Sequence, residues 1–195
     1  FQEKAGKSIV YSKYEDGELA SMAFFTPSRV MFRGSECICP YIVGVATRRE
    51  SRHKQYMTLL LEQGLMDHRW RGAKLAFLCP ADENIYKPFG FQGVYYRRQI
   101  EVLGNKQKWY SAVSFSRLEP QLRNKAAEFA SAQLYMSGLD LYLCRSREYY
   151  ETLHKEMKAL EGRVIVLREG EFIKGVAAYI HEEDTYEVTE LICDP

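Results

Sequence analysis

A run of basic and polar residues at positions 48–55 follows a short apolar run and precedes a segment with helical periodicity. The first backbone N–H groups of a helix have no intrahelical partner and lie at the positive end of the helix dipole. Beside Arg52 and Lys54, such groups suit a phosphate or a pyrophosphate. A solvated basic loop is the other interpretation, because charged runs usually face water.

Tyr86 is the second candidate for chemistry, in the sequence YKPFGF at positions 86–91. A tyrosine hydroxyl has an ordinary pKa of about 10, so it is protonated at neutral pH and can donate a proton to a leaving group. Tyr86 could equally be a packing aromatic beside Phe89 and Phe91. Asp82 and Glu83 are the nearby carboxylates that could attract a cation, or they could simply face solvent.

Other reactive residues do not form a recognisable constellation. Ser51 and His53 lack an acidic third member at a triad spacing. Cys79 lies at the end of a predicted buried strand, where thiols are usually inert. Cys37 and Cys39 are too close for a zinc knuckle and have no partner pair. We therefore expect no metal site and read all the cysteines as reduced thiols, as in a cytoplasmic protein.

Strand and helix signals surround the candidate loop. The continuous apolar run at 41–46 predicts a buried strand, and the segment 73–79 predicts another. Between them, one apolar helical face predicts a helix over 56–69, which makes the order a βαβ-type unit. The face consists of Met57, Leu60, Leu61, Gly64, Leu65 and His68.

Hairpins and helices are predicted on either side of this unit. Asp16-Gly17 between two apolar runs predicts a hairpin with strands at 8–14 and 19–25, which Pro27 ends. A similar hairpin at 164–180 indicates a weak internal repeat, although any two hairpins look alike. Further strands are expected at 94–102 and 109–115, and helices at 122–134 and 148–160.

The segments YIVGVATRRESRHKQYMTLLLEQGL and LAFLCPADENIYKPFGFQ resemble the acetyl-CoA motif and the following tyrosine segment of the GNAT superfamily. Together they resemble the tandem-GNAT proteins of the enhanced-intracellular-survival type. The resemblance implies an α/β fold, more narrowly α+β with a mixed sheet, of the acyl-CoA N-acyltransferase kind. It implies a first GNAT-like domain at 1–118 and the N-terminal half of a second at 119–195. Because Phe1 is not a methionine, we expect part of the first domain to precede it.

The resemblance also implies an activity and a site. The activity is transfer of an acetyl group from acetyl-CoA, the co-substrate, to a primary amine by direct attack. The amine would be an aminoglycoside, a polyamine or a protein lysine. Tyr86 would protonate the departing thiolate. The coenzyme would be bound by residues of the strand and loop: Val43, Val45, Thr47, Arg52, His53, Lys54, Gln55, Tyr56 and Met57.

The sequence departs from the family pattern in the loop. Gln55 stands at the first loop glycine and Met57 near the second small residue. Glycine there lets the backbone approach the phosphates closely, so Gln55 could obstruct binding. This departure motivates an alternative, a non-catalytic acyl-CoA-binding or protein-interaction module. A third interpretation is a peptide- or nucleic-acid-binding α/β domain that uses the basic loop.

Composition narrows the partners. The formal net charge is +1 and 46% of the residues are hydrophobic. A charge so near zero argues against nucleic acid and an anionic membrane surface. No stretch of about 18 apolar residues and no signal-peptide pattern occur, so we expect a cytoplasmic protein. The sequence leaves a homo-oligomer open and does not identify the amine.

Overall fold

The structure of the 195-residue chain is a computed structural model that describes residues 7–95, 111–183 and 185–194. By internal contacts the chain forms two compact units, Phe1–Val30 with Ser35–Val102 and Met31–Gly34 with Leu103–Pro195. The units divide before 118 because β4 (Ser111–Ser114) pairs with β6 (Arg163–Glu169) of the second unit. That each unit belongs to its own GNAT-like domain stays a prediction.

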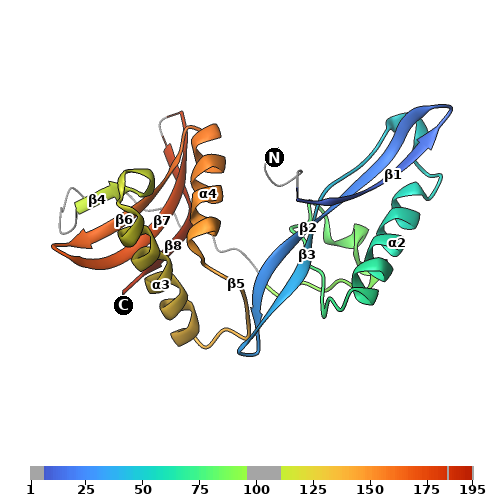
Figure 1. Ribbon diagram of the computed structural model, residues 1–195. Helices are drawn as coiled ribbons and strands as arrows, with labels where there is room; N and C mark the ends of the chain where they lie inside the picture. Colours follow the sequence, from blue (N-terminus) through green and yellow to red (C-terminus); the bar gives the residue numbers. More distant parts are fainter. Residues whose placement is uncertain (1–6, 96–110, 184, 195) are drawn as a thin grey trace. The chain divides into compact units, whose positions relative to one another are not determined.

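The first unit is built on the strands β1 (Ile9–Glu15), β2 (Glu18–Phe32) and β3 (Ser35–Thr47), in that order (Figure 1). Asp16 and Gly17 have φ values of 52° and 81°, the signs that a two-residue type I′ turn requires. The predicted hairpin is therefore confirmed.

The predicted end of β2 at Pro27 is wrong, because the strand continues to Phe32. The pairing of β1 with β2 reaches only from Glu15↔Glu18 to Ile9↔Phe25. Pro27 is exposed and lies beyond this ladder, where its missing N–H breaks no bond to β1. The proline therefore marks the end of the pairing with β1 and not the end of β2.

The helix α2 (Tyr56–Trp70) confirms the predicted helix and its apolar face. Leu60, Leu61, Gly64 and His68 are buried on it. At Gly64 the helix passes so close to the sheet that a Cβ atom would lie 2.3 Å from Cζ of Phe25. His68 stacks on the same ring at 5.2 Å between centroids. The sequence places a glycine where Phe25 must fit beneath the helix.

The predicted strand 73–79 is wrong as a strand, since it is reduced to one parallel bridge between Tyr41 and Phe77. The N–H of Ile42 donates to the carbonyl of Phe77 at 2.9 Å, and that of Phe77 to the carbonyl of Pro40 at 3.1 Å. The segment is only partly buried, and Cys79 is exposed, so its predicted burial is also wrong.

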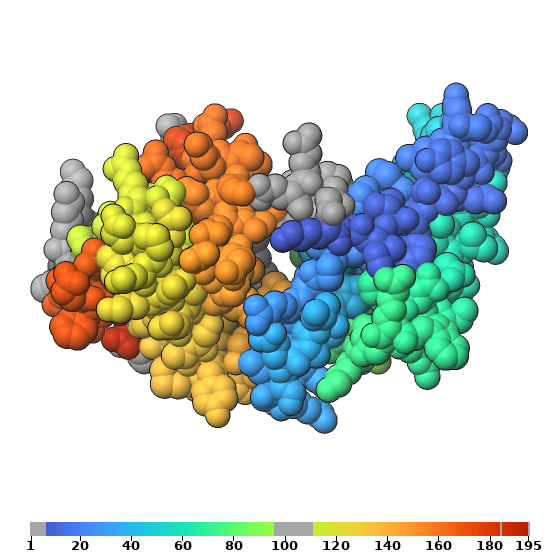
Figure 2. Space-filling view, viewed as in Figure 1, coloured from blue at the N-terminus to red at the C-terminus, as the bar shows by residue number. Residues whose placement is uncertain are grey.

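The second unit places two helices, α3 (Pro120–Met136) and α4 (Arg147–Ala159), on one antiparallel sheet. The sheet has the order β4-β6-β7-β8, with β7 at Phe172–Glu182 and β8 at Thr185–Cys193. Side chains of α3 and α4 cover much of it in the space-filling view (Figure 2). Their core includes Ala126, Ala130, Tyr150, Val164, Val166, Val176 and Ala178.

Both predicted helices and the second hairpin are confirmed in this unit. Helix α3 extends two residues further at each end than expected, and α4 begins and ends one residue earlier. The short strand β5 (Leu141–Leu143) was not predicted. The predicted strand 94–102 lies almost entirely outside the described residues. Among the residues that the structure describes, no helix is long and apolar enough to cross a membrane.

Candidate active site

The edge of β3 that faces residues 73–79 opens after Ile42. The bonds of Phe77 to Pro40 and Ile42 join the two segments, and within the described ranges no later backbone bond between them is found. Backbone groups of an extended strand point alternately to its two edges. The end of β3 therefore has an edge that an extended ligand could pair with, as an added strand does.

Gly44 sets which residues face this open edge. Its φ of 63° breaks the alternation in β3. The N–H of Arg48 bonds to the carbonyl of Ala20 in β2 at 2.8 Å. Since the N–H of Arg48 points to β2 and backbone groups alternate between the two edges, the backbone groups of Thr47 and Val45 point to the open edge. The N–H of Ile42 points to Phe77, so the backbone groups of the next residue, Val43, point to β2. A coenzyme contact of Val43 stays a prediction, and this alternation does not favour it.

The loop between β3 and α2 contains two residues in the left-handed region. His53 has a φ of 64° and Gln55, the residue before α2, a φ of 60°. Glycine adopts this region without the steric cost that other residues meet. The two positions that favour glycine are thus 53 and 55, whereas Met57 lies within α2. The departure from the family pattern at Gln55 therefore falls at a position whose backbone conformation favours glycine. The departure at Met57 does not.

The start of α2 presents unpaired donors. Leu59 makes the first helical bond, from its N–H to the carbonyl of Gln55 at 3.0 Å, and Gln55 provides no side-chain cap. The N–H groups of Tyr56, Met57 and Thr58 find no acceptor among the described residues. Because they lie at the N-terminus of a helix, these groups are donors of the kind that bind anions.

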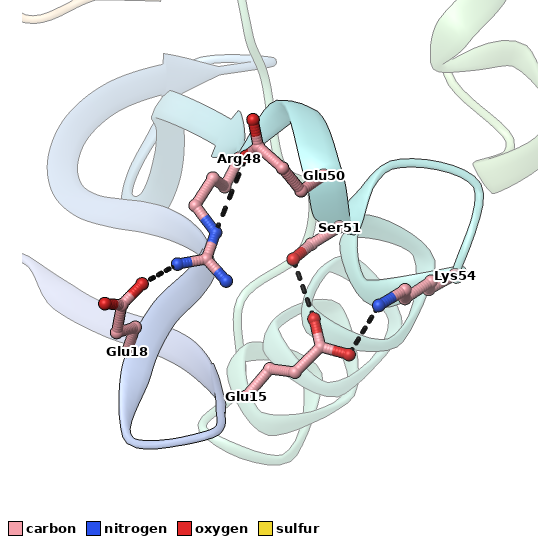
Figure 3. A network of polar contacts seen from close by, with 6 residues as sticks. All are labelled: Glu15, Glu18, Arg48, Glu50, Ser51 and Lys54. Carbon is pink, nitrogen blue, oxygen red and sulfur yellow. Dashed lines mark hydrogen bonds and ion pairs between the residues drawn. The ribbon is translucent and has the colours of Figure 1, made fainter.

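Glu15, at the end of β1, reaches into this loop (Figure 3). Its carboxylate accepts hydrogen bonds from Ser51 Oγ at 2.8 Å, Lys54 Nζ at 2.5 Å and Tyr56 Oη at 3.1 Å. The bond from Lys54, followed by that from Ser51, lowers the pKa of Glu15 to about 2. A carboxylate thus holds the side chains of Lys54 and Tyr56, and their predicted contact with a pyrophosphate stays a prediction.

The remaining cations of the loop differ in their partners. Arg48 forms ion pairs with Glu18 and, at 3.7 Å, with Glu50 (Figure 3). Arg52 is exposed and makes no side-chain contact with a carboxylate within the described part of the chain. Arg52 is therefore the predicted phosphate ligand whose side chain stays available.

Tyr86 lies between two short 3₁₀ turns, Glu83–Ile85 and Lys87–Phe89. Its ring packs edge-on against Phe91 at 6.1 Å between centroids. Burial raises the pKa of Tyr86, which keeps the hydroxyl protonated at neutral pH. Within the described residues the hydroxyl has no hydrogen-bond partner, so it can still donate to a ligand.

One apolar cluster joins these parts. Val45 of β3, Met57 of α2 and Tyr86 all pack against the buried core around Phe25 and Leu61. The structure thus brings the open strand edge, the helix start and Tyr86 together in the first unit. Glu15 and Glu18 were missed in the sequence, where they appear only as the residues flanking a turn. Their adjacency to a predicted turn was the available signal, but nothing local shows which loop that turn meets.

Residues 1–94 match the family model for the acetyltransferase (GNAT) domain. This part of the chain is a GNAT acetyltransferase domain. The match contains the open edge of β3, the loop before α2 and Tyr86. It confirms the family that the two sequence motifs indicated. No curated protein sequence matches the chain.

Solved structures share the fold over nearly the whole chain. A conserved protein of unknown function with a suggested N-acyltransferase role, from Enterococcus faecalis V583, has a TM-score of 0.73 at 18% identity and covers 98% of this chain and 49% of its own. Eis1 from Mycobacterium abscessus has a TM-score of 0.63 at 16% identity, covering 95% and 50%. A GCN5-related N-acetyltransferase from Kribbella flavida has a TM-score of 0.55 at 16% identity, covering 95% and 46%.

The chain spans about half the length of these solved structures. At such identities the likeness concerns the fold alone. It confirms the expected mixed α/β architecture with a GNAT-like arrangement.

Proposed function

We propose that this protein is an acetyl-CoA-dependent N-acetyltransferase that acts on a primary amine. The observation that carries the proposal is the start of α2, whose free N–H groups directly follow the left-handed residues His53 and Gln55, beside an open strand edge. The GNAT family match supports acetyl transfer in general. A small-molecule or peptide amine, a cytoplasmic location and a tandem partner domain belong to the proposal.

In this proposal the chain binds acetyl-CoA through its backbone. Val45 and Thr47 offer N–H and C=O groups to the pantetheine arm at the open edge of β3. The N–H groups of Tyr56, Met57 and Thr58 bind the pyrophosphate, with Arg52 as the available cation. Residues 53–55 supply the curvature that lets the phosphates approach.

The proposed reaction is direct transfer of the acetyl group from the thioester to the amine. The neutral amine attacks the thioester carbonyl, and positioning of the two reactants contributes most of the acceleration. An N–H near Val45 stabilises the oxygen that gains negative charge. Tyr86 donates its proton to the leaving sulfur as the C–S bond breaks, the acylated nitrogen releases one proton to solvent, and the tyrosinate takes a proton back from solvent. The products are an acetylated amine and coenzyme A.

A turnover assay tests this proposal. The full-length protein is mixed with acetyl-CoA and a panel of polyamines, aminoglycosides and lysine-containing peptides, and released thiol is measured. At least one amine class should release coenzyme A together with an acetylated amine that mass spectrometry detects. Binding of acetyl-CoA with no turnover on any amine would favour the non-catalytic module. Absence of acetyl-CoA binding would favour the peptide- or nucleic-acid-binding interpretation.

The non-catalytic module remains the second candidate because of Gln55. Gln55→Gly is expected to raise the free energy of unfolding by about 0.5–1 kcal/mol, because glycine removes the left-handed strain. It should also lower the Kd for acetyl-CoA by up to about tenfold by giving the phosphates room. Chemical denaturation and calorimetry measure the two effects.

Gln63→Gly is the matched control for this change. Gln63 lies inside α2, where glycine costs about 1 kcal/mol and leaves the loop unchanged. We expect the two stability changes to have opposite signs: Gln55→Gly should stabilise the protein and Gln63→Gly should destabilise it. If Gln55→Gly binds acetyl-CoA no better than the parent, the glutamine side chain already points away from the phosphates.

A further inference from the structure

The β1–β2 turn carries two carboxylates directly opposite each other. Glu15 and Glu18 are cross-strand partners in the antiparallel pair, on either side of Asp16 and Gly17. Like charges placed directly opposite destabilise a strand pair. The hairpin end is therefore electrostatically unfavourable unless cations from elsewhere compensate it.

The loop between β3 and α2 supplies those cations, one for each carboxylate (Figure 3). Glu18 pairs with Arg48 where the loop leaves β3. Glu15 pairs with Lys54 shortly before α2 begins and also accepts a bond from buried Ser51. The side chain of Glu15 is 23% exposed, less than that of Lys54 at 46%, so the carboxylate is the more enclosed partner.

The same loop has a shape that needs support. Two non-glycine residues, His53 and Gln55, hold left-handed conformations, and Gln55 provides no side-chain cap to α2. Such strained conformations persist only where the surroundings fix them. Glu15 accepts hydrogen bonds from Ser51, before His53, and from Lys54, after it, and these bonds can fix the conformation of the loop.

We propose that the β1–β2 turn is a clamp that holds the coenzyme loop in its binding shape, with Glu15 as the positioning residue. The inference rests on the proposed function, because it assigns a role at the same site. Glu15 holds the side chain of Lys54, and the phosphates then meet backbone N–H groups and Arg52.

The clamp and the charge of Glu15 predict opposite effects of its removal on coenzyme binding. Removing a carboxylate next to an anion site should tighten binding of the anion if only electrostatics matter. Removing the residue that shapes the loop should weaken it. We expect Glu15→Ala to raise the Kd for acetyl-CoA about tenfold, and Glu15→Gln, which can still bond to Ser51, to raise it less.

The binding test uses the full-length protein and calorimetry with two probes, acetyl-CoA and acetyl-pantetheine, which lacks the phosphates. The loss on Glu15→Ala should appear with acetyl-CoA and be absent with acetyl-pantetheine. Glu62→Ala is the charge-matched control, since Glu62 is exposed on α2 and forms no ion pair within the described ranges. Binding of acetyl-CoA by Glu15→Ala that equals or exceeds the parent's would overturn the clamp.

Hydrogen exchange without any ligand separates the clamp from the proposed function. The amides of Ser51, Arg52 and Leu59 are bonded to the carbonyls of Arg48, Arg49 and Gln55. In Glu15→Ala these three amides should exchange at least about fivefold faster than in the parent, and in Glu62→Ala they should not. If the parent fails to bind acetyl-CoA, the proposed function is lost while faster exchange still supports the clamp. Unchanged exchange in Glu15→Ala refutes the clamp whatever the coenzyme does.

Discussion

Tyr86→Phe is expected to lower kcat by about 10²–10⁴-fold in the full-length enzyme, the usual contribution of a positioned acid. The KM for acetyl-CoA should change little, because the hydroxyl acts mainly in the transition state. The ring itself is retained, so the edge-on packing with Phe91 persists and the fold should not change. Steady-state kinetics with the best amine of the panel measure both constants.

Tyr14→Phe is the control for this variant. Tyr14 is 60% exposed on β1, so loss of its hydroxyl should leave kcat unchanged. A parental kcat in Tyr86→Phe would mean that Tyr86 only packs and that another group protonates the thiolate. If the KM of Tyr86→Phe rises while its kcat stays unchanged, the hydroxyl contributes to binding and not to proton transfer.

The second large effect concerns stability, at an enclosed ion pair in the second unit. Arg145 and Glu190 pair at 2.7 Å, with only 13% and 12% of their side chains exposed. Tyr149 donates to the same carboxylate at 3.0 Å, and Arg145 donates to the carbonyl of Leu143 at 2.6 Å. Burial, with the charge of Glu190 as the next cause, raises the pKa of Tyr149 far above its ordinary value.

Glu190→Ala is therefore expected to lower the free energy of unfolding by about 3–5 kcal/mol, because it leaves an enclosed guanidinium without its partner. Chemical denaturation measures the change. Asp194→Ala is the control, since its pair with Lys174 is more exposed and should be worth at most about 1 kcal/mol. A loss below 1 kcal/mol in Glu190→Ala would show that solvent reaches Arg145 and replaces the carboxylate.

Local signals in the sequence predicted the elements that depend on neighbouring residues. Asp16-Gly17 specifies its hairpin because both positions accept positive φ, and α2 follows from an apolar stripe that ends in His68. The helix was also the basis for expecting an anion site at its N-terminus. These parts needed no knowledge of distant contacts.

Features that depend on tertiary contacts were not predictable in this way. Pro27 looked like a strand end, but the length of β1 decides whether its missing N–H matters. Residues 73–79 have a strand-like sequence, yet only Phe77 meets β3 as a bridge. The role of Glu15 depends on which loop the β1–β2 turn approaches, and His53 looked ordinary until its backbone conformation was known.

The most direct test of the proposed function is a calorimetric titration of the full-length protein with acetyl-CoA. The predicted result is saturable binding that coenzyme A displaces. Arg52→Ala should weaken this binding by roughly 1.5–3 kcal/mol, the contribution of a hydrogen bond to a charged group. Acetyl-pantetheine should bind more weakly, because the loop before α2 recognises the phosphates. Absence of binding by both the parent and Gln55→Gly would contradict an acetyl-CoA site at this loop.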